Sequence, residues 1–100
     1  MLSMINYVLI DDEPKNIKIL KGMLDEFCPD IEFVGAASGV DDGEALIRKE
    51  QPRLVFLDIQ LSNENGFHLL DRLMPASFEV IFVTAYNEYA VRALDRKSVV

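Results

Sequence analysis

Three short apolar runs in this chain each end on an acid or a hydroxyl, and no other feature constrains the fold as strongly. They are residues 7–10 before Asp11 and Asp12, residues 54–57 before Asp58, and residues 80–83 before Thr84. Runs that are apolar throughout are typical of strands buried on both faces of a parallel sheet. Parallel strands bring their C-terminal ends to one edge, where ligands of open α/β sheets bind. The sequence therefore predicts that these polar side chains meet around one crevice.

The segments between these runs alternate between helical and β-like patterns. Apolar residues at intervals of three and four predict an amphipathic helix over about residues 14–27. Residues 31–37 are β-like, and a second helix is expected after them, with Ser38 or Asp41 as its cap and Pro52 as its end. This order is that of βαβ units, in which helices cover a parallel sheet.

The second half of the chain continues the alternation. Residues 63–66 have the chemistry of a turn, so a loop is expected there, followed by a short helix with Phe67, Leu69, Leu70 and Leu73 that Pro75 closes. Residues 88–97 have the pattern of a further helix. With 100 residues, half of them apolar, the chain suffices for one α/β domain with a modest core and leaves no room for a second.

Composition excludes several classes of function. The formal net charge of -7 argues against direct binding of this segment to nucleic acid, which requires an excess of Lys and Arg. Cys28 is the only cysteine, which excludes an internal disulfide and a cysteine-rich metal site. No apolar run approaches the length that spans a membrane, and residues 1–10 lack the basic flank of a signal peptide. The sequence predicts a cytoplasmic domain with no membrane partner.

The acids at the predicted crevice need a partner of opposite charge. Two unit charges about 4 Å apart repel by roughly 4 kcal/mol at an effective dielectric constant near 20. A bound cation or raised pKa values must offset this repulsion. Mg²⁺ fits best, because it prefers carboxylate oxygens and keeps water molecules that can face a phosphoryl group.

Each of these residues also has a simpler interpretation. Asp11 and Asp12 are compatible with a solvated turn or a helix cap. Asp58 is compatible with a turn, and Thr84 with an ordinary β-branched strand residue. The placement of Asp58 opposite the first pair of acids favours a functional site. A functional role for Thr84 is supported only by its predicted place beside these aspartates.

Several motifs in this order resemble the receiver domain of two-component response regulators. They are residues 11–14 (DDEP), residues 58–61 (DIQL) with Gly66 and Phe67 after them, and Thr84-Ala85. Residues 86–91 with Ala93 are similar to receivers that are joined to LytTR-type DNA-binding domains. The resemblance runs from about residue 6 to residue 94. It implies a flavodoxin-like, CheY-like α/β fold, a doubly wound parallel sheet with strand order 2-1-3-4.

The resemblance also implies a role for each residue of the crevice. Asp58 would be the phosphoacceptor, which takes a phosphoryl group from a phosphohistidine of a sensor histidine kinase. Asp12 and Asp58 would ligate Mg²⁺ together with the backbone carbonyl of Gln60, and Asp11 would hold the ion through water. Thr84 would turn its hydroxyl onto a phosphoryl oxygen once Asp58 is modified.

At the level of the whole domain, the resemblance implies a switch rather than an enzyme. Such a domain assists its own phosphoryl transfer and hydrolysis, and Gln60 and Tyr86 occupy positions that tune this hydrolysis in the family. The simpler interpretations of these two residues are a polar loop residue and a half-buried aromatic. The switch would control an output domain that regulates transcription and is absent from this chain, and DNA would be contacted only through that domain.

The sequence departs from the family pattern in two places. Ser62 stands where receivers usually carry a proline, which leaves the φ angle of the loop after Asp58 unfixed. The family also has a fifth strand, with a lysine that pairs with the phosphoryl group, and a fifth helix. Residues 1–100 are therefore interpreted as a receiver domain truncated before the fifth strand, and Lys97 is not assigned the lysine's role because it follows Thr84 too closely.

The missing strand has consequences for assembly and for function. Residues 80–83 would form an open sheet edge, which predicts a homodimer or a swap of elements between copies. Without the lysine, an alternative function is a receiver-like protein-interaction module that is not phosphorylated. A phosphohydrolase of the haloacid dehalogenase type is disfavoured, because Gln60 occupies the position of the second acid that this class requires.

Overall fold

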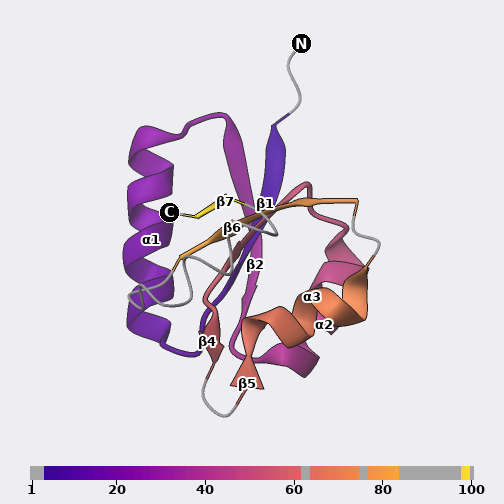
Figure 1. The fold of residues 1–100 in the computed structure, drawn as a ribbon. Helices are drawn as coiled ribbons and strands as arrows, with labels where there is room; N and C mark the ends of the chain where they lie inside the picture. The colour runs from indigo at the N-terminus through magenta and orange to yellow at the C-terminus, as the bar shows by residue number, and fades with distance from the viewer. Residues whose placement is uncertain (1–3, 62–63, 75–76, 84–97, 100) are drawn as a thin grey trace.

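The computed structural model of the chain describes residues 4–61, 64–74, 77–83 and 98–99. Five parallel strands form one sheet in the order β2-β1-β3-β6-β7 (Figure 1). These strands are β1 (Ile5–Ile10), β2 (Ile31–Ala37), β3 (Leu54–Leu57), β6 (Glu79–Phe82) and β7 (Ser98–Val99). A separate antiparallel pair consists of β4 (Gln60–Leu61) and β5 (Glu64–Asn65). The predicted flavodoxin-like α/β sheet is confirmed, since the first four strands of the parallel sheet have the order 2-1-3-4.

Helices cover the sheet unequally. The helix α1 (Pro14–Phe27) lies on one side, and α2 (Val40–Glu50) and α3 (Gly66–Leu73) lie on the other (Figure 1). Side chains alternate along β1 accordingly: Tyr7 and Leu9 pack with residues of α1, whereas Val8 and Ile10 pack with residues of α2 and α3. This alternation is expected for a strand that is buried on both faces. None of the described helices is long and apolar enough to cross a membrane.

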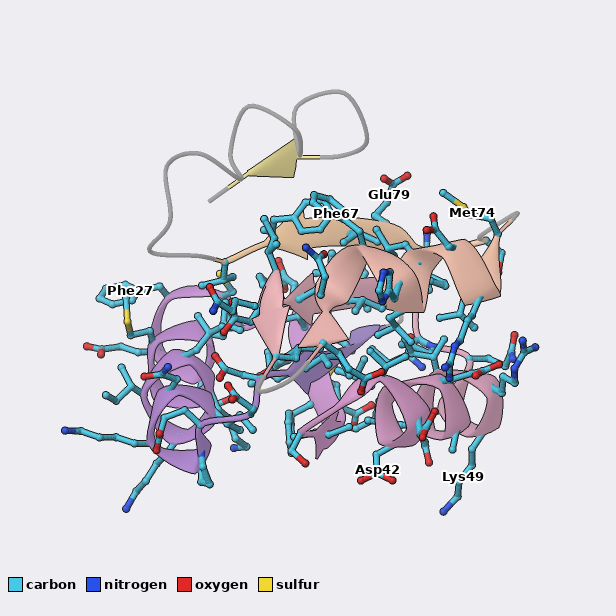
Figure 2. All side chains as sticks on the ribbon, turned by 60° about the horizontal axis from the view of Figure 1, so that its bottom comes forward. Phe27, Asp42, Lys49, Phe67, Met74 and Glu79 are labelled. Atoms are coloured by element: carbon cyan, nitrogen blue, oxygen red, sulfur yellow. The ribbon has the colours of Figure 1, made fainter. Side chains whose placement is uncertain are left out.

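The predicted bounds of the first elements agree with the structure. The helix over residues 14–27 and the strand over residues 31–37 are present with these bounds. The helix α2 ends at Glu50, and Gln51 follows in a left-handed conformation (φ 48°) just before Pro52. At the exposed end of α1, Phe27 points away from the body of the molecule (Figure 2).

The start of α2 differs from the prediction. Its N-cap is Gly39 in an extended conformation, so the expectation that Ser38 or Asp41 caps the helix is wrong. Glycine is tolerated at this position at a cost of only a few tenths of a kcal/mol relative to a polar cap. Asp41 and Asp42 lie in the first turn instead, where their negative charges interact favourably with the partial positive charge of the helix N-terminus.

Two residues of the loop expected over residues 63–66, Glu64 and Asn65, form β5, which pairs with β4. Gln60 pairs with Asn65 and Leu61 with Glu64, and α3 begins at Gly66, one residue earlier than expected. The side chain of Asn65 caps α3 by accepting a hydrogen bond from the backbone N–H of Phe67 at 2.8 Å. The predictions that concern Ser62, Pro75, Lys97 and the helix over residues 88–97 lie outside the described residues.

The prediction that the fifth strand is missing is wrong. Ser98 and Val99 form β7, whose register sets Ser98 beside Ile81 and Val99 beside Phe82 of β6. Two residues are too few to produce a recognisable sequence pattern, but they suffice for parallel pairing with a neighbouring strand. The outer edge of β6 is therefore not open at Ile81 and Phe82, where an unpaired edge was expected. No fifth helix is found among the described residues.

The hydroxyl of Tyr7 is buried between β1 and α1 and has no hydrogen-bond partner among the described residues. The Tyr7 ring makes edge contacts with Phe33 and Phe56, at centroid distances of 5.7 and 5.6 Å. Burial raises the pKa of Tyr7, and the nearby Asp25 and Cys28 raise it further. An unsatisfied buried hydroxyl costs about 1–3 kcal/mol.

We therefore expect Tyr7→Phe to stabilise the domain. The change keeps the ring contacts and removes the unsatisfied hydroxyl, so the free energy of unfolding should rise by about 1 kcal/mol. Urea denaturation of both chains, followed by circular dichroism, measures this difference. A loss of stability in Tyr7→Phe would instead reveal that the hydroxyl has a partner, such as a buried water molecule.

Candidate functional site

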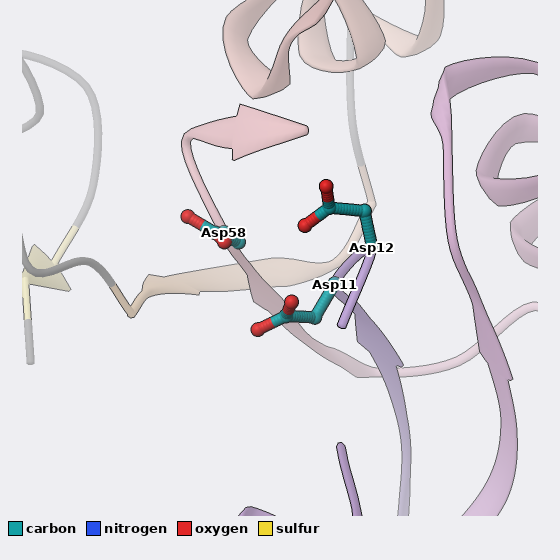
Figure 3. Close-up of side chains that lie close together, drawn as sticks. All are labelled: Asp11, Asp12 and Asp58. Carbon is teal, nitrogen blue, oxygen red and sulfur yellow. The ribbon is translucent and has the colours of Figure 1, made fainter. Parts of the chain in front are cut away.

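Three aspartates meet at the C-terminal edge of the parallel sheet (Figure 3). Asp11 and Asp12 directly follow β1, and Asp58 directly follows β3. These two strands are neighbours, and their last residues, Ile10 and Leu57, are partners in the sheet. The juxtaposition of the three acids is thus a direct result of parallel pairing.

Backbone hydrogen bonds extend the sheet into the site. The N–H of Asp58 donates to the carbonyl of Ile10 at 2.9 Å, and the N–H of Asp11 donates to the carbonyl of Ala37 at 3.0 Å. The N–H of Val83 likewise donates to the carbonyl of Leu57 at 2.9 Å. Asp11 and Asp58 are therefore held by the same ladder of hydrogen bonds as the strands beneath them.

The three carboxylates are close enough to share one cation. Each offers an oxygen atom, and these atoms all lie within 4.8 Å of one another. Oxygen atoms that ligate one Mg²⁺ from opposite sides are about 4 Å apart, since each bond is about 2.1 Å long. All three side chains are half-buried, so they are accessible while part of their hydration is removed.

Burial and mutual repulsion disfavour the charged forms of these acids. The pKa of Asp58 is raised from 3.8 to about 6, mainly by burial and further by the charges of Asp11 and Asp12, while hydrogen bonds from the backbone N–H groups of Gln60 and Ile59 lower it. Burial likewise raises the pKa of Asp11. The site therefore concentrates negative charge that a bound cation would stabilise.

Local hydrogen bonds orient two of the three carboxylates. Asp58 accepts a hydrogen bond on Oδ1 from the backbone N–H of Gln60 at 3.1 Å. Asp11 accepts one on Oδ1 from the backbone N–H of Glu13 at 2.9 Å, and the side chain of Asn16 also hydrogen-bonds Asp11. These hydrogen bonds define the orientations of both carboxylates.

The residues predicted for the site have different outcomes. Asp11, Asp12 and Asp58 are brought together as expected. Gln60 is exposed two residues after Asp58, and its backbone N–H contacts that carboxylate. Thr84 lies outside the described residues, and so does Tyr86.

Two further residues adjoin the site: Asn16 was not predicted there, and Gly66 was singled out only as part of a family motif. Asn16 lines a crevice with Asp11, Asp58 and Val83, and Gly66 packs against the backbone of Asp58. Asn16 could have been suspected from its place in the first turn of the helix that follows Asp11. Gly66 stands in the motif that follows residues 58–61, but its contact with Asp58 was not predicted, because that contact depends on how the segment between Asp58 and α3 folds.

Comparisons with known proteins identify the family of the chain. The chain is 37% identical to the sensory transduction protein LytT of Bacillus anthracis over 94 residues, which cover 92% of this chain and 38% of LytT. It therefore spans about two fifths of the length of such relatives. The response regulator domain of Thermotoga maritima CheB superposes with a TM-score of 0.84 at 25% identity, covering 97% of this chain and 77% of that one.

A second solved structure is that of the MaeR response regulator bound to beryllium trifluoride. It superposes with a TM-score of 0.78 at 26% identity and covers 92% of this chain and 76% of that chain. The sequence pattern of the response regulator receiver domain matches residues 7–99, almost the whole chain. The strand order and the aspartate cluster are those expected for this domain. Because the match covers almost the whole sequence, the chain belongs to the response regulator receiver domain family.

Proposed function

We propose that this receiver domain accepts a phosphoryl group on Asp58 beside a bound Mg²⁺ ion. The observation that carries this proposal is the meeting of Asp11, Asp12 and Asp58, whose carboxylate oxygens lie within 4.8 Å of one another. A phosphoryl acceptor needs an ionised oxygen nucleophile and a means to neutralise charge. This cluster offers both.

The proposed metal ligands are oxygen atoms, which Mg²⁺ prefers. Asp12 and Asp58 would bind the ion directly, together with the backbone carbonyl of Gln60, and Asp11 would hold it through water. The raised pKa values of Asp11 and Asp58 support the fit, because they reflect a site in which uncompensated negative charge is unfavourable. When bound, Mg²⁺ supplies neutralisation of charge on the phosphoryl oxygens.

The proposed donor is a phosphohistidine of a sensor histidine kinase. A carboxylate oxygen of Asp58 forms a bond to phosphorus while the bond from phosphorus to the histidine nitrogen breaks, and the electron pair of that bond returns to the imidazole. Such transfers have a loose transition state, so positioning and charge neutralisation dominate catalysis. With a pKa of about 6, Asp58 is mostly ionised at neutral pH and available for attack.

The proposed consequence of modification is a switch. The hydroxyl of Thr84 would turn onto a phosphoryl oxygen and bias a surface that has two states. Gln60 and Tyr86 would tune the hydrolysis that resets the domain. Two of the similar proteins support a signalling role. LytT is a sensory transduction protein. The MaeR response regulator binds beryllium trifluoride, an ion that resembles a phosphoryl group in shape.

The wider setting of the domain is part of the same proposal. It would act in the cytoplasm and control an output domain outside this chain that regulates transcription, and only that domain would contact DNA. A homodimer or a swap of elements stays a prediction, which now has less support because β7 pairs with β6. Size-exclusion chromatography with light scattering at high protein concentration tests it.

Incubation with Mg²⁺ and acetyl phosphate, followed by mass spectrometry of the intact chain, tests the proposed function. We expect a mass gain of one phosphoryl group in the unmodified chain and no gain in Asp58→Asn. Asp30→Asn is the matched control, because Asp30 is an exposed acid in the turn before β2, at the opposite edge of the sheet, and should leave uptake unchanged.

The other outcomes separate the alternatives. No gain in the unmodified chain would favour the interaction module, which acts through unmodified surfaces. A gain that persists in Asp58→Asn would contradict the choice of phosphoacceptor. Steady turnover of phosphate esters would indicate a phosphohydrolase instead of a switch.

A further inference from the structure

Gly66 packs against the backbone of Asp58 more closely than any side chain allows. A Cβ atom at Gly66 would lie 2.5 Å from the carbonyl oxygen of Asp58, 3.1 Å from the Cα of Ile59 and 3.2 Å from the Ile59 carbonyl oxygen. All three neighbours are backbone atoms, which cannot rotate away as the end of a flexible side chain can. The N–H of Gly66 also donates a hydrogen bond to the carbonyl of Ile59. Gly66 is thus in direct contact with the segment that carries the proposed phosphoacceptor.

The helix that Gly66 begins has little freedom to move away from this contact. Three of the next four residues of α3 are almost completely buried: Phe67 is 2% exposed, Leu69 0% and Leu70 1%. The ring of Phe67 packs against that of Phe82, with centroids 5.3 Å apart. Closely packed cores resist displacement of this kind. A side chain at Gly66 would therefore push mainly on the other partner, the backbone at Asp58 and Ile59.

A shift of that backbone would reach the Asp58 carboxylate. The Asp58 side chain is half-buried at the crevice, so the carboxylate has room to follow such a shift, whereas the neighbouring Ile59 is fully buried. The Oδ1 atom of Asp58 accepts a hydrogen bond from Gln60 within the same short loop, so the carboxylate moves with the loop. Gln60 in turn pairs with Asn65, the residue before Gly66, in the hairpin that closes the loop.

We infer that Gly66 is a positioning residue for the aspartate cluster, because its lack of a side chain lets α3 press the backbone of Asp58 into the place where its carboxylate meets Asp11 and Asp12. This inference rests on the proposed function for the role of Asp58. The contact itself does not depend on it. Residues that orient metal ligands without touching the metal commonly change metal affinity 10- to 100-fold.

Titration of the full chain with Mg²⁺ by calorimetry tests the inference. We expect Gly66→Ala to weaken Mg²⁺ binding by roughly 10- to 100-fold and to slow phosphoryl uptake from acetyl phosphate. Gly22→Ala is the matched control, because a Cβ atom there meets nothing within 4 Å. Asn65→Ala is the second control: it removes the N-cap of α3 and destabilises the same helix end without adding an atom beside Asp58. Both controls should bind Mg²⁺ like the unmodified chain.

A second measurement reports the displacement itself. In two-dimensional NMR spectra of the metal-free chain, the amide signals of Asp58 and Ile59 should shift clearly in Gly66→Ala and much less in Asn65→Ala. If Gly66→Ala folds poorly, it is combined with Gly22→Ala, which adds helix stability of about 1 kcal/mol, and studied with an osmolyte that favours the folded state.

The outcomes separate this inference from the proposed function. Unchanged Mg²⁺ affinity in folded Gly66→Ala, or equal effects in Asn65→Ala, would overturn the role of Gly66. If the unmodified chain binds Mg²⁺ but takes no phosphoryl group, the proposed function fails while the affinity comparison still decides on Gly66. If the unmodified chain binds no Mg²⁺, the metal proposal fails, and the amide shifts then decide whether Gly66 positions the backbone of Asp58.

Discussion

Replacing Phe82 with alanine is expected to lower the free energy of unfolding by about 3–5 kcal/mol. Phe82 is fully buried in β6 and packs against Phe67 of α3. The change would remove a ring from the core that joins the sheet to α2 and α3, and a cavity would remain. Domains of this size have total stabilities of only about 5–15 kcal/mol. A shift of the urea midpoint, measured by circular dichroism, gives the loss.

Phe27→Ala is the matched control for this prediction. The chemical change is the same, but Phe27 is 70% exposed at the end of α1 and points away from the molecule (Figure 2). Its effect should stay within about 0.5 kcal/mol. Comparable losses in the two variants would mean that Phe27 is covered in solution, and a small loss in Phe82→Ala would contradict the packing around β6.

Asp58→Asn is expected to stabilise the metal-free domain at neutral pH. The folded-state pKa of Asp58, about 6, lies above its ordinary value of 3.8, so the folded chain binds the proton more tightly than the unfolded chain does. The stability that Asp58 contributes is therefore fully present below about pH 3.8 and is lost as the pH rises through about 6. A pKa shift of this size corresponds to a change of about 3 kcal/mol in the free energy of unfolding. Solvent screening of the half-exposed carboxyl reduces this change to about 1.5 kcal/mol.

Denaturation curves at several pH values and with Mg²⁺ check this prediction. At pH 7.5 without metal, Asp58→Asn should be the more stable chain by about 1.5 kcal/mol, and the difference should shrink toward pH 4. Added Mg²⁺ should stabilise the unmodified chain and have much less effect on Asp58→Asn, because a ligand that binds only the folded state raises its stability. Asp30→Asn should show neither effect. A difference independent of pH would exclude the Asp58 carboxyl as its source.

The sequence was sufficient to predict the parallel sheet and the convergence of the aspartates. Apolar runs that end on Asp11 and Asp58 leave few alternatives, because parallel pairing of adjacent strands determines where the residues after them lie. The bounds of α1 followed from its regular apolar spacing. In these places a local pattern and the tertiary structure agree.

The features that the sequence did not predict depend on contacts between distant residues. Gly39 takes the N-cap position of α2 although a polar cap was expected, because packing of the helix outweighs a few tenths of a kcal/mol at its end. The strand β7 has only two residues and exists because β6 lies beside it. The contact of Gly66 with Asp58 depends on the packing of α3 in the core, which brings Gly66 against the backbone of Asp58.

The aspartate cluster is attached to β1 and β3, and both strands have a neighbour on each side. Backbone amides in such interior strands exchange their hydrogens with solvent only in the rarest and largest openings of a protein. Brief fraying at the margin of the sheet, near β7, would thus leave the arrangement of the acids undisturbed. The proposed readiness to receive a phosphoryl group would then persist through most of the thermal fluctuations of the domain.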